Sequence, residues 1–128
     1  MREIKFRAWD KKKKVMFNRI LDVNFCDAGI FTVVAEYNDE EHLLLGEDIK
    51  LMQFTGLQDK NGKEIWEGDV VQIQEYKGKH IVGKIVFNNE IGRFCFSDSD
   101  GLMWGLTTKD KFNEAIGNVH ENPELLNK

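Results

Sequence analysis

The sequence predicts an all-β protein built from antiparallel hairpins, with at most one or two short helices. Three observations support this fold class. Short segments alternate β-branched or aromatic residues with polar ones. Glycines separate these segments at short intervals, as turn residues do. No segment carries a helical period long enough for a βαβ crossover, so a parallel sheet is not expected.

The N-terminal part of the chain contains two predicted hairpins. In the first, an alternating segment over residues 4–8 is followed by a turn over 10–14 and a return strand from Val15. In the second, the segments 20–25 and 30–36 flank an Asp-Ala-Gly turn whose glycine can supply the positive φ that closes it. These two hairpins account for most of the first 36 residues.

The middle of the chain leaves one alternative open. The segment 40–45 fits either a short strand or one helical turn, whereas 51–55 fits an extended strand. The run Asp-Lys-Asn-Gly over 59–62 is typical of a hairpin connection with glycine at its left-handed position. It is expected to join two short strands.

The C-terminal half contains the clearest hairpin, in which the runs 70–76 and 81–87 flank a Lys-Gly-Lys turn. A small SH3-like barrel over residues 68–106 would fit these strands. Three further extended segments are predicted over residues 94–96, 102–104 and 115–119. One short helix is predicted over residues 107–113.

Length and composition predict a single domain over residues 1–128, since no linker of biased composition divides the chain. Aromatic residues make up 11% of the sequence and are expected to dominate the core. Only two cysteines occur, Cys26 and Cys95, and no signal peptide or apolar run of about 20 residues is visible. We therefore expect reduced thiols, a cytoplasmic location and no membrane partner.

The net charge of −4 argues against bulk attraction to nucleic acid, although a local basic patch remains an alternative. Arg93 precedes Phe94 and Phe96, which share one strand face as stacking aromatics do in sheet-based RNA binders. A core position is the competing interpretation of these rings. The candidate nucleic-acid patch consists of Lys11, Lys12, Lys13, Lys14, Lys77, Lys79, Lys84 and Arg93.

The sequence contains no complete chemical motif with the spacing that its chemistry requires. We therefore predict no catalytic, cofactor-binding or metal-binding residues. The Asp-rich runs ending at Gly62 and Gly101 lack the other ligands of a calcium loop and are interpreted as hairpin turns. The histidines and cysteines lack zinc spacing. No nucleophile elbow, phosphate loop or dinucleotide fingerprint occurs. Enzymatic activity is left open, with a non-enzymatic role favoured.

Four segments of the sequence form a recognisable set. They are Arg-Glu-Ile-Lys-Phe-Arg-Ala-Trp-Asp over 2–10, Leu-Met-Gln-Phe-Thr-Gly-Leu-Gln-Asp over 51–59 leading into Asn-Gly-Lys over 61–63, Ile-Trp-Glu-Gly-Asp-Val-Val over 65–71, and Ile-Gly-Asn-Val-His-Glu-Asn-Pro-Glu-Leu-Leu over 116–126. In order and spacing they resemble the YopX family of small proteins from phages and prophages. The resemblance covers nearly the whole chain apart from residues 18–48. It implies a β-rich fold and a phage context, and it supplies no site residues to transfer.

Two of these segments also have a physical interpretation. We expect Gly68 to permit a backbone bend, Asp69 to accept hydrogen bonds from turn amides, and Trp66 to pack beside them. Asn122 before Pro123 is expected to cap a short terminal helix. We assign these motifs a structural role.

The favoured function is a non-enzymatic binding or assembly module that acts through protein–protein contacts. Sheet edges in an aromatic-rich protein favour self-association into a homo-oligomer, and a host or phage protein is a second expected partner. Acidic residues that could bind a basic host protein lie within residues 18–48, the part that the family resemblance does not cover. They are Glu36, Asp39, Glu40, Glu41, Glu47 and Asp48. The alternative function is a nucleic-acid-associated β module using the basic patch.

Overall fold

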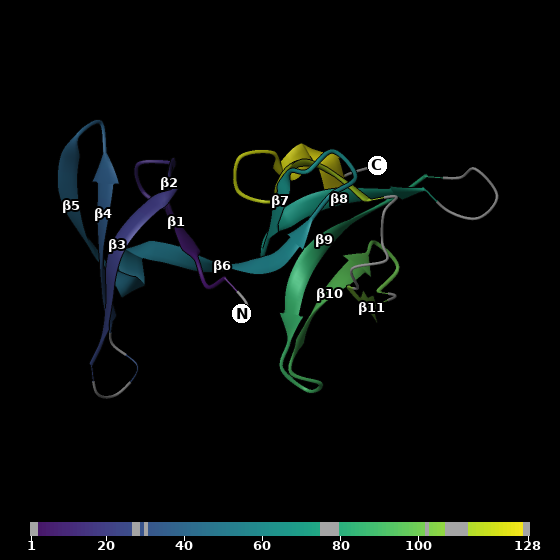
Figure 1. Ribbon diagram of the computed structural model, residues 1–128, viewed down its shortest axis with the longest axis horizontal. Helices are drawn as coiled ribbons and strands as arrows, with labels where there is room; N and C mark the ends of the chain where they lie inside the picture. Colours follow the sequence, from purple (N-terminus) through teal and green to yellow (C-terminus); the bar gives the residue numbers. More distant parts are fainter. Residues whose placement is uncertain are drawn as a thin grey trace. The chain divides into compact units, whose positions relative to one another are not determined.

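The computed structural model describes residues 3–26, 29, 31–74, 80–101, 103–106 and 113–126, which form mainly β-strands (Figure 1). All strand pairs of these residues are antiparallel. The prediction of an all-β fold is therefore confirmed. The chain divides into two compact units, Glu3–Gln53 and Phe54–Lys128, and each is described by itself. The single domain over residues 1–128 stays a prediction.

The elements that the structure describes in the first unit are five strands, the first half of a sixth and the 3-10 turn η2. They are β1 (Phe6–Asp10), β2 (Val15–Phe17), β3 (Arg19–Phe25), β4 (Phe31–Tyr37), β5 (Glu40–Leu45), η2 (Gly46–Asp48) and the start of β6 (Ile49–Gln58). Strand β1 lies between β2 and β6, and β4 lies between β3 and β5. The two predicted N-terminal hairpins are thus confirmed as β1–β2 and β3–β4.

Local turn chemistry shapes the hairpins of the first unit. The Oδ1 atom of Asp10 accepts hydrogen bonds from the backbone N–H groups of Lys12 and Lys13 at 2.9 and 3.0 Å. Between β4 and β5, Asn38 and Asp39 both have positive φ, at 53° and 64°. Two successive positive φ values define a tight hairpin turn that matches the twist of its strands. This turn makes the segment 40–45 a strand and settles the alternative left open by the sequence.

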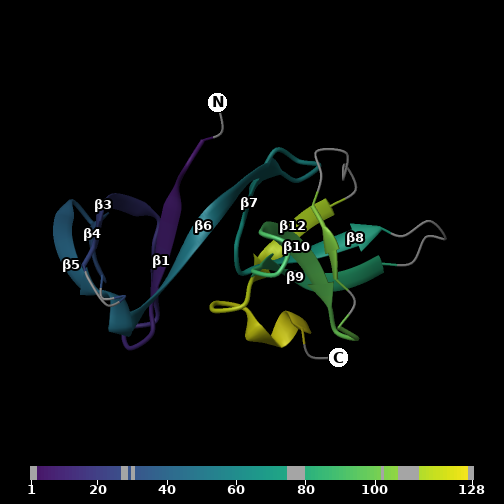
Figure 2. The ribbon, with the colours of Figure 1, turned by 90° about the horizontal axis from the view of Figure 1, so that it is seen from below.

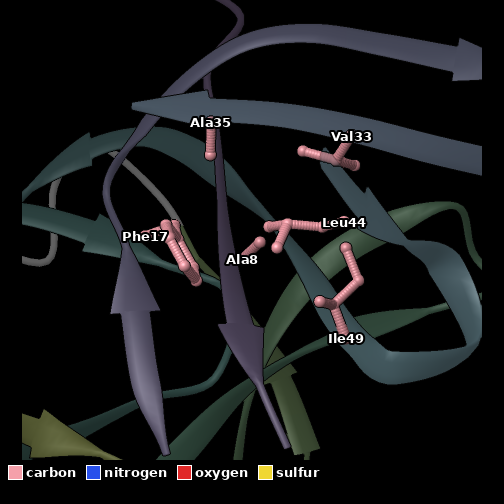
Figure 3. Packing of buried hydrophobic residues seen from close by; sticks show 6 residues of the cluster. All are labelled: Ala8, Phe17, Val33, Ala35, Leu44 and Ile49. Carbon is pink, nitrogen blue, oxygen red and sulfur yellow. The ribbon is translucent and has the colours of Figure 1, made fainter. Parts of the chain in front are cut away.

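A buried apolar cluster holds the first unit together (Figure 3). Its side chains come from β1, β2, β4, β5 and β6 and converge on one interior: Ala8, Phe17, Val33, Ala35, Leu44 and Ile49. Because side chains alternate across a strand, the burial of Leu44 leaves Leu43 and Leu45 on the opposite face of β5. That face is not covered by this core.

The second unit contains the end of β6, six further strands and a terminal 3-10 turn. They are β7 (Glu64–Trp66), β8 (Asp69–Gln74), β9 (His80–Asn88), β10 (Arg93–Asp98), β11 (Met103–Gly105), β12 (Asn113–Asn118) and η3 (Pro123–Leu126). Five strands form one sheet in the order β11-β10-β9-β8-β12. Strands β8, β9, β10 and β12 of this sheet are labelled in Figure 2. The end of β6 pairs with β7, and the register shifts between Phe54 and Leu57.

The predicted elements of this half are largely confirmed. Strands β8 and β9 pair from Val70 with Lys84 to Gln74 with His80, and their connection over 75–79 lies outside the described residues. Of the predicted helix over 107–113, residues 107–112 also lie outside them, and Asn113 begins β12. The SH3-like barrel stays a prediction.

Phe96 lies at the centre of the second core, with none of its surface exposed. It packs with Ile65, Val71, Ile85 and Leu106, and Phe94 joins the same cluster as a partly buried ring. The core interpretation of these two phenylalanines is confirmed, and the stacking interpretation fails for Phe96 because no base can reach it. Cys95, which alternates with them, is buried as a free thiol.

Gly83 of β9 pairs with Asp98 of β10, where the packing leaves no room for a side chain. A Cβ atom there would collide with the backbone oxygen of Ser97 and lie 2.6 Å from the Phe96 ring. We therefore expect Gly83→Ala to lower the free energy of unfolding by about 1–3 kcal/mol through overpacking. Urea denaturation followed by circular dichroism measures this change. Lys84→Ala, at the exposed neighbouring position, is the matched control and is expected to change stability by less than about 0.5 kcal/mol.

Candidate protein-interaction surface

The Trp-Glu-Gly-Asp segment forms a turn that is held by hydrogen bonds to its own residues and to neighbouring strands. The Oδ2 atom of Asp69 accepts a hydrogen bond from the backbone N–H of Trp66 at 2.8 Å. Gly68 has a φ of 87°; its N–H donates to the carbonyl of Ile85, and its carbonyl accepts from Val119, both at 2.8 Å. The segment ties the start of β8 to β9 and to the end of β12.

Asp59 is a second buried anchor, which sequence analysis treated only as a turn residue. Its Oδ1 accepts from the N–H groups of Asn61 and Lys63, both at 2.9 Å, and its Oδ2 accepts from Ala115 at 3.0 Å. Burial raises the pKa of Asp59, but these hydrogen bonds, that from Ala115 foremost, bring it below its ordinary value. These three hydrogen-bond donors to the carboxylate are all backbone amides of the fold.

The C-terminal turn corrects one detail of the prediction. A short helix does follow Pro123, as the 3-10 turn η3. The Oδ1 atom of Asn122, however, accepts from the backbone N–H of Asn118 at 3.3 Å, on the preceding strand. Asn118 shapes the turn itself, since its Oδ1 accepts from His120 and Glu121 at 3.0 and 2.8 Å. The Asn122 side chain therefore points back to β12 instead of forward into η3.

The predicted basic residues are distributed between the two units. The four lysines of 11–14 are exposed at the β1–β2 turn in the first unit. Lys84 and Arg93 lie on β9 and β10 in the second unit, and the Nη2 atom of Arg93 donates to the carbonyl of Leu106 at 2.8 Å. Lys77 and Lys79 lie outside the described residues. A single nucleic-acid patch formed by all eight residues stays a prediction.

One surface of the first unit carries large apolar side chains that are exposed to solvent. Leu43 is 69% exposed and Leu45 is 46% exposed, and both lie on the face of β5 that turns away from the core. Across the sheet, Val34 is the partner of Leu43 and Thr32 is the partner of Leu45. We call the face of β5 that carries Glu41, Leu43 and Leu45, together with the adjoining Glu47, the β5 surface.

A hollow of about 500 Å³ continues the β5 surface at the end of the sheet. It is lined by Gly29, Phe31, Thr32, Leu45, Gly46 and Glu47. A Cβ atom at Gly46 would lie 2.6 Å from the Phe31 ring and 2.8 Å from the Phe31 carbonyl. Glycine at this position therefore allows η2 to approach β4 closely beside the hollow.

Acidic side chains flank the apolar part of the β5 surface. Glu40, Glu41 and Glu47 are all exposed. Two other members of the predicted acidic group are paired: Glu36 with Arg19 at 3.4 Å, and Asp48 with Lys12 at 3.3 Å. The charge that the β5 surface offers to a partner therefore comes mainly from Glu41 and Glu47, because Glu40 lies on the opposite face of the strand, with Leu44.

The backbone edge of β5 is also available. Strand β4 pairs with one side of β5, and none of the described strands pairs with the other. An unpaired edge presents N–H and carbonyl groups that can hydrogen-bond to an added strand. The sequence missed this surface because the segment 40–45 could equally be a helical turn. The Asn-Asp pair before it is the signal that could have identified the hairpin.

Among the described residues, no three His, Cys, Asp or Glu side chains are grouped so that they could hold a metal ion. The run ending at Gly101 is a hairpin turn, in which the Asp98 carboxylate and carbonyl accept from Asp100 and Gly101 at 3.0 and 3.3 Å. Within the part of the chain that the structure describes, no helix is long and apolar enough to cross a bilayer.

The fold and this surface define a small all-β protein of two hairpin-rich units, with an uncovered edge strand in the first. The family model described as YopX protein matches the sequence over residues 5–127, and the chain belongs to this family. The family resemblance inferred from sequence is thus confirmed. No curated protein matches the sequence.

Two solved structures are similar over almost their whole length. The crystal structure of protein EF1440 from Enterococcus faecalis has a TM-score of 0.67 at 28% identity, covering 98% of this chain and 99% of that one. The crystal structure of protein yopX from Bacillus subtilis has a TM-score of 0.69 at 24% identity, covering 100% and 98%. Both are named without an activity, so the likeness provides fold and family and no site residue.

Proposed function

We propose that this chain is a non-enzymatic β-rich binding or assembly module that acts through protein–protein contacts. The observation that carries the proposal is the β5 surface, where two large apolar side chains are exposed beside a hollow and an unpaired strand edge. Exposed apolar patches of this kind are typical of interaction sites. The family resemblance implies that the chain acts in a phage or prophage context, in the cytoplasm of the bacterial host.

Affinity capture tests this proposal directly. The full chain, tagged at either end, is expressed in a lysogenic or phage-infected host and cross-linked before purification. Stoichiometric recovery of one or a few proteins, including a second copy of the chain, is the expected result. Recovery of no protein above the level of an unrelated tagged β protein, in both tag orientations, would contradict it.

Self-association is the simplest form of such assembly. The described sheets end in several edge strands, among them β5, β3 and β11, and uncovered edges favour pairing with another chain. Multi-angle light scattering across micromolar concentrations measures this property. A mass above that of the 14.9 kDa monomer is expected, whereas a strict monomer at every concentration would rule out homo-oligomerisation.

The alternative function, association with nucleic acid, has one supporting observation: four consecutive lysines are exposed at the β1–β2 turn. If these lysines neutralise phosphates, the logarithm of the association constant for a short duplex or single strand falls linearly with the logarithm of the salt concentration. Replacing Lys11 and Lys13 by Gln should then reduce that slope by about two, since each phosphate contact contributes about 0.9. Binding that is absent or independent of salt rules this function out.

A further inference from the structure

We propose that the β5 surface binds an extended segment of a partner protein that carries apolar residues at alternate positions, with a basic residue at each end of this run. This inference rests on the proposed function, because it names the partner class and the element that receives it. The segment would add to the open edge of β5 as a further strand. In this mode of recognition, backbone hydrogen bonds supply affinity and alternate side chains supply specificity.

The order of side chains along β5 specifies the partner's pattern. Leu43 and Leu45, two residues apart, lie on the same face of the strand. Glu41 lies two residues before Leu43 and therefore on the same face. Their partners on β4, Glu36 and Val34, are likewise two residues apart. Glu47 follows at the rim of the hollow. An added strand would thus place apolar side chains beside the leucines and basic ones beside the two glutamates.

Charge favours a basic protein over a second copy of this chain. If two β5 strands paired around a twofold axis at Leu44, Glu41 of each copy would lie opposite Glu47 of the other copy. Like charges placed across neighbouring strands are destabilising, whereas opposite charges stabilise the pair. The chain as a whole carries a net charge of −4. A basic partner is therefore electrostatically complementary to this surface.

The apolar component explains why this surface is more than a solvated acidic loop. Leu43 is among the most exposed large hydrophobic residues of the described chain, at 69%. The neighbouring hollow has an aromatic wall formed by Phe31 and an aliphatic one formed by Leu45. Burying these groups supplies affinity that charge alone does not, because the hydrophobic effect is proportional to the apolar area removed from water.

A peptide titration tests the inference. The probe is a fluorescein-labelled peptide of sequence Lys-Thr-Val-Thr-Val-Thr-Lys, and its partner peptide carries Glu in place of both Lys residues. Fluorescence anisotropy with the full-length protein should show saturable binding of the basic peptide, at least about tenfold tighter than the acidic one. N-methylation of alternate backbone amides in the basic peptide should abolish binding, since it removes the hydrogen bonds of an added strand.

Charge-reversal variants locate the binding site. The double substitution Glu41→Lys with Glu47→Lys should weaken the basic peptide about tenfold and reverse the preference between the two peptides. Glu90→Lys with Glu124→Lys is the matched control, since both positions are exposed in the second unit and the net charge changes equally. It should leave the preference unchanged. Circular dichroism confirms that each variant is folded.

The outcomes distinguish this inference from the proposed function. Absence of peptide binding, or equal weakening by the two double variants, overturns the β5 assignment. If the captured partner of the wild-type chain is retained by the Glu41 and Glu47 variant, the proposed function stands and this inference fails. A light-scattering dimer that Leu43→Lys dissociates, with no affinity for the basic peptide, would show that a second copy occupies β5 and would also overturn the inference.

Discussion

Phe96→Ala is expected to cause the largest loss of stability of any single apolar truncation in the second unit, lowering the free energy of unfolding by about 3–5 kcal/mol. Phe96 is fully buried and shares a core cluster with Ile85 of the neighbouring strand β9 and Val71 of β8, the next strand of the sheet. Removing its ring loses the transfer free energy of the buried atoms and leaves a cavity that a β-sheet core can only partly close. Equilibrium urea denaturation, followed by far-ultraviolet circular dichroism, measures the change.

Phe25→Ala is the matched control for this truncation. It removes the same ring, but Phe25 is 69% exposed and contacts Phe31 at a centroid distance of 5.9 Å. We expect the control to cost less than about 1 kcal/mol, the contribution of a single aromatic pair. Equal losses in the two variants would show that Phe96 does not occupy the core position described here.

Asp59→Ala is the second large expected effect. It would leave the amide groups of Asn61, Lys63 and Ala115 without their carboxylate acceptor. Buried donors without a partner cost about 1–3 kcal/mol each, less where water can replace the acceptor. We expect a total loss of about 3 kcal/mol. Asp100→Ala, at an exposed turn position, should change stability by less than about 0.5 kcal/mol.

The pH dependence of stability provides an independent test of Asp59. Because its pKa in the folded chain is lowered, the folded state stabilises the ionised form relative to the unfolded state. That stabilisation is fully present above the unfolded pKa of about 3.9 and is lost as the pH falls through the lower folded value. The stability difference between wild type and Asp59→Asn should therefore shrink below about pH 4. A difference that is constant from pH 3 to 7 would contradict the hydrogen-bonded carboxylate.

The hairpins could be predicted from sequence because their signals are local. Alternation over residues 4–8 and the runs on either side of the 75–79 connection directly indicated strands, and the structure pairs them as β1–β2 and β8–β9. Glycine and asparagine at the corners indicated the turns. The role of Gly68 and Asp69 was also predictable, since the residue types fit a bend with a carboxylate acceptor.

Long-range pairings could not be predicted. The hydrogen bond from Ala115 to Asp59 joins residues 56 positions apart, and no local pattern indicates such a partner. The β5 surface was missed for a related reason. The leucines of residues 43–45 are contiguous, which fits a helical turn as well as a strand, so only the sheet register shows that Leu44 is buried and its neighbours are exposed. The flanking glutamates, in contrast, are visible in the sequence as a candidate surface for a basic protein.

Hydrogen exchange of the β5 backbone amides tests the central claim most directly. In the free protein, strand order leaves one edge of β5 open, so part of its amides should exchange quickly. Addition of the basic peptide Lys-Thr-Val-Thr-Val-Thr-Lys should slow amide exchange in residues 40–45. Exchange in β9 and β10 should stay unchanged, since an added strand protects only the edge it joins. Protection confined to another strand, or no protection at a saturating peptide concentration, would contradict binding at β5.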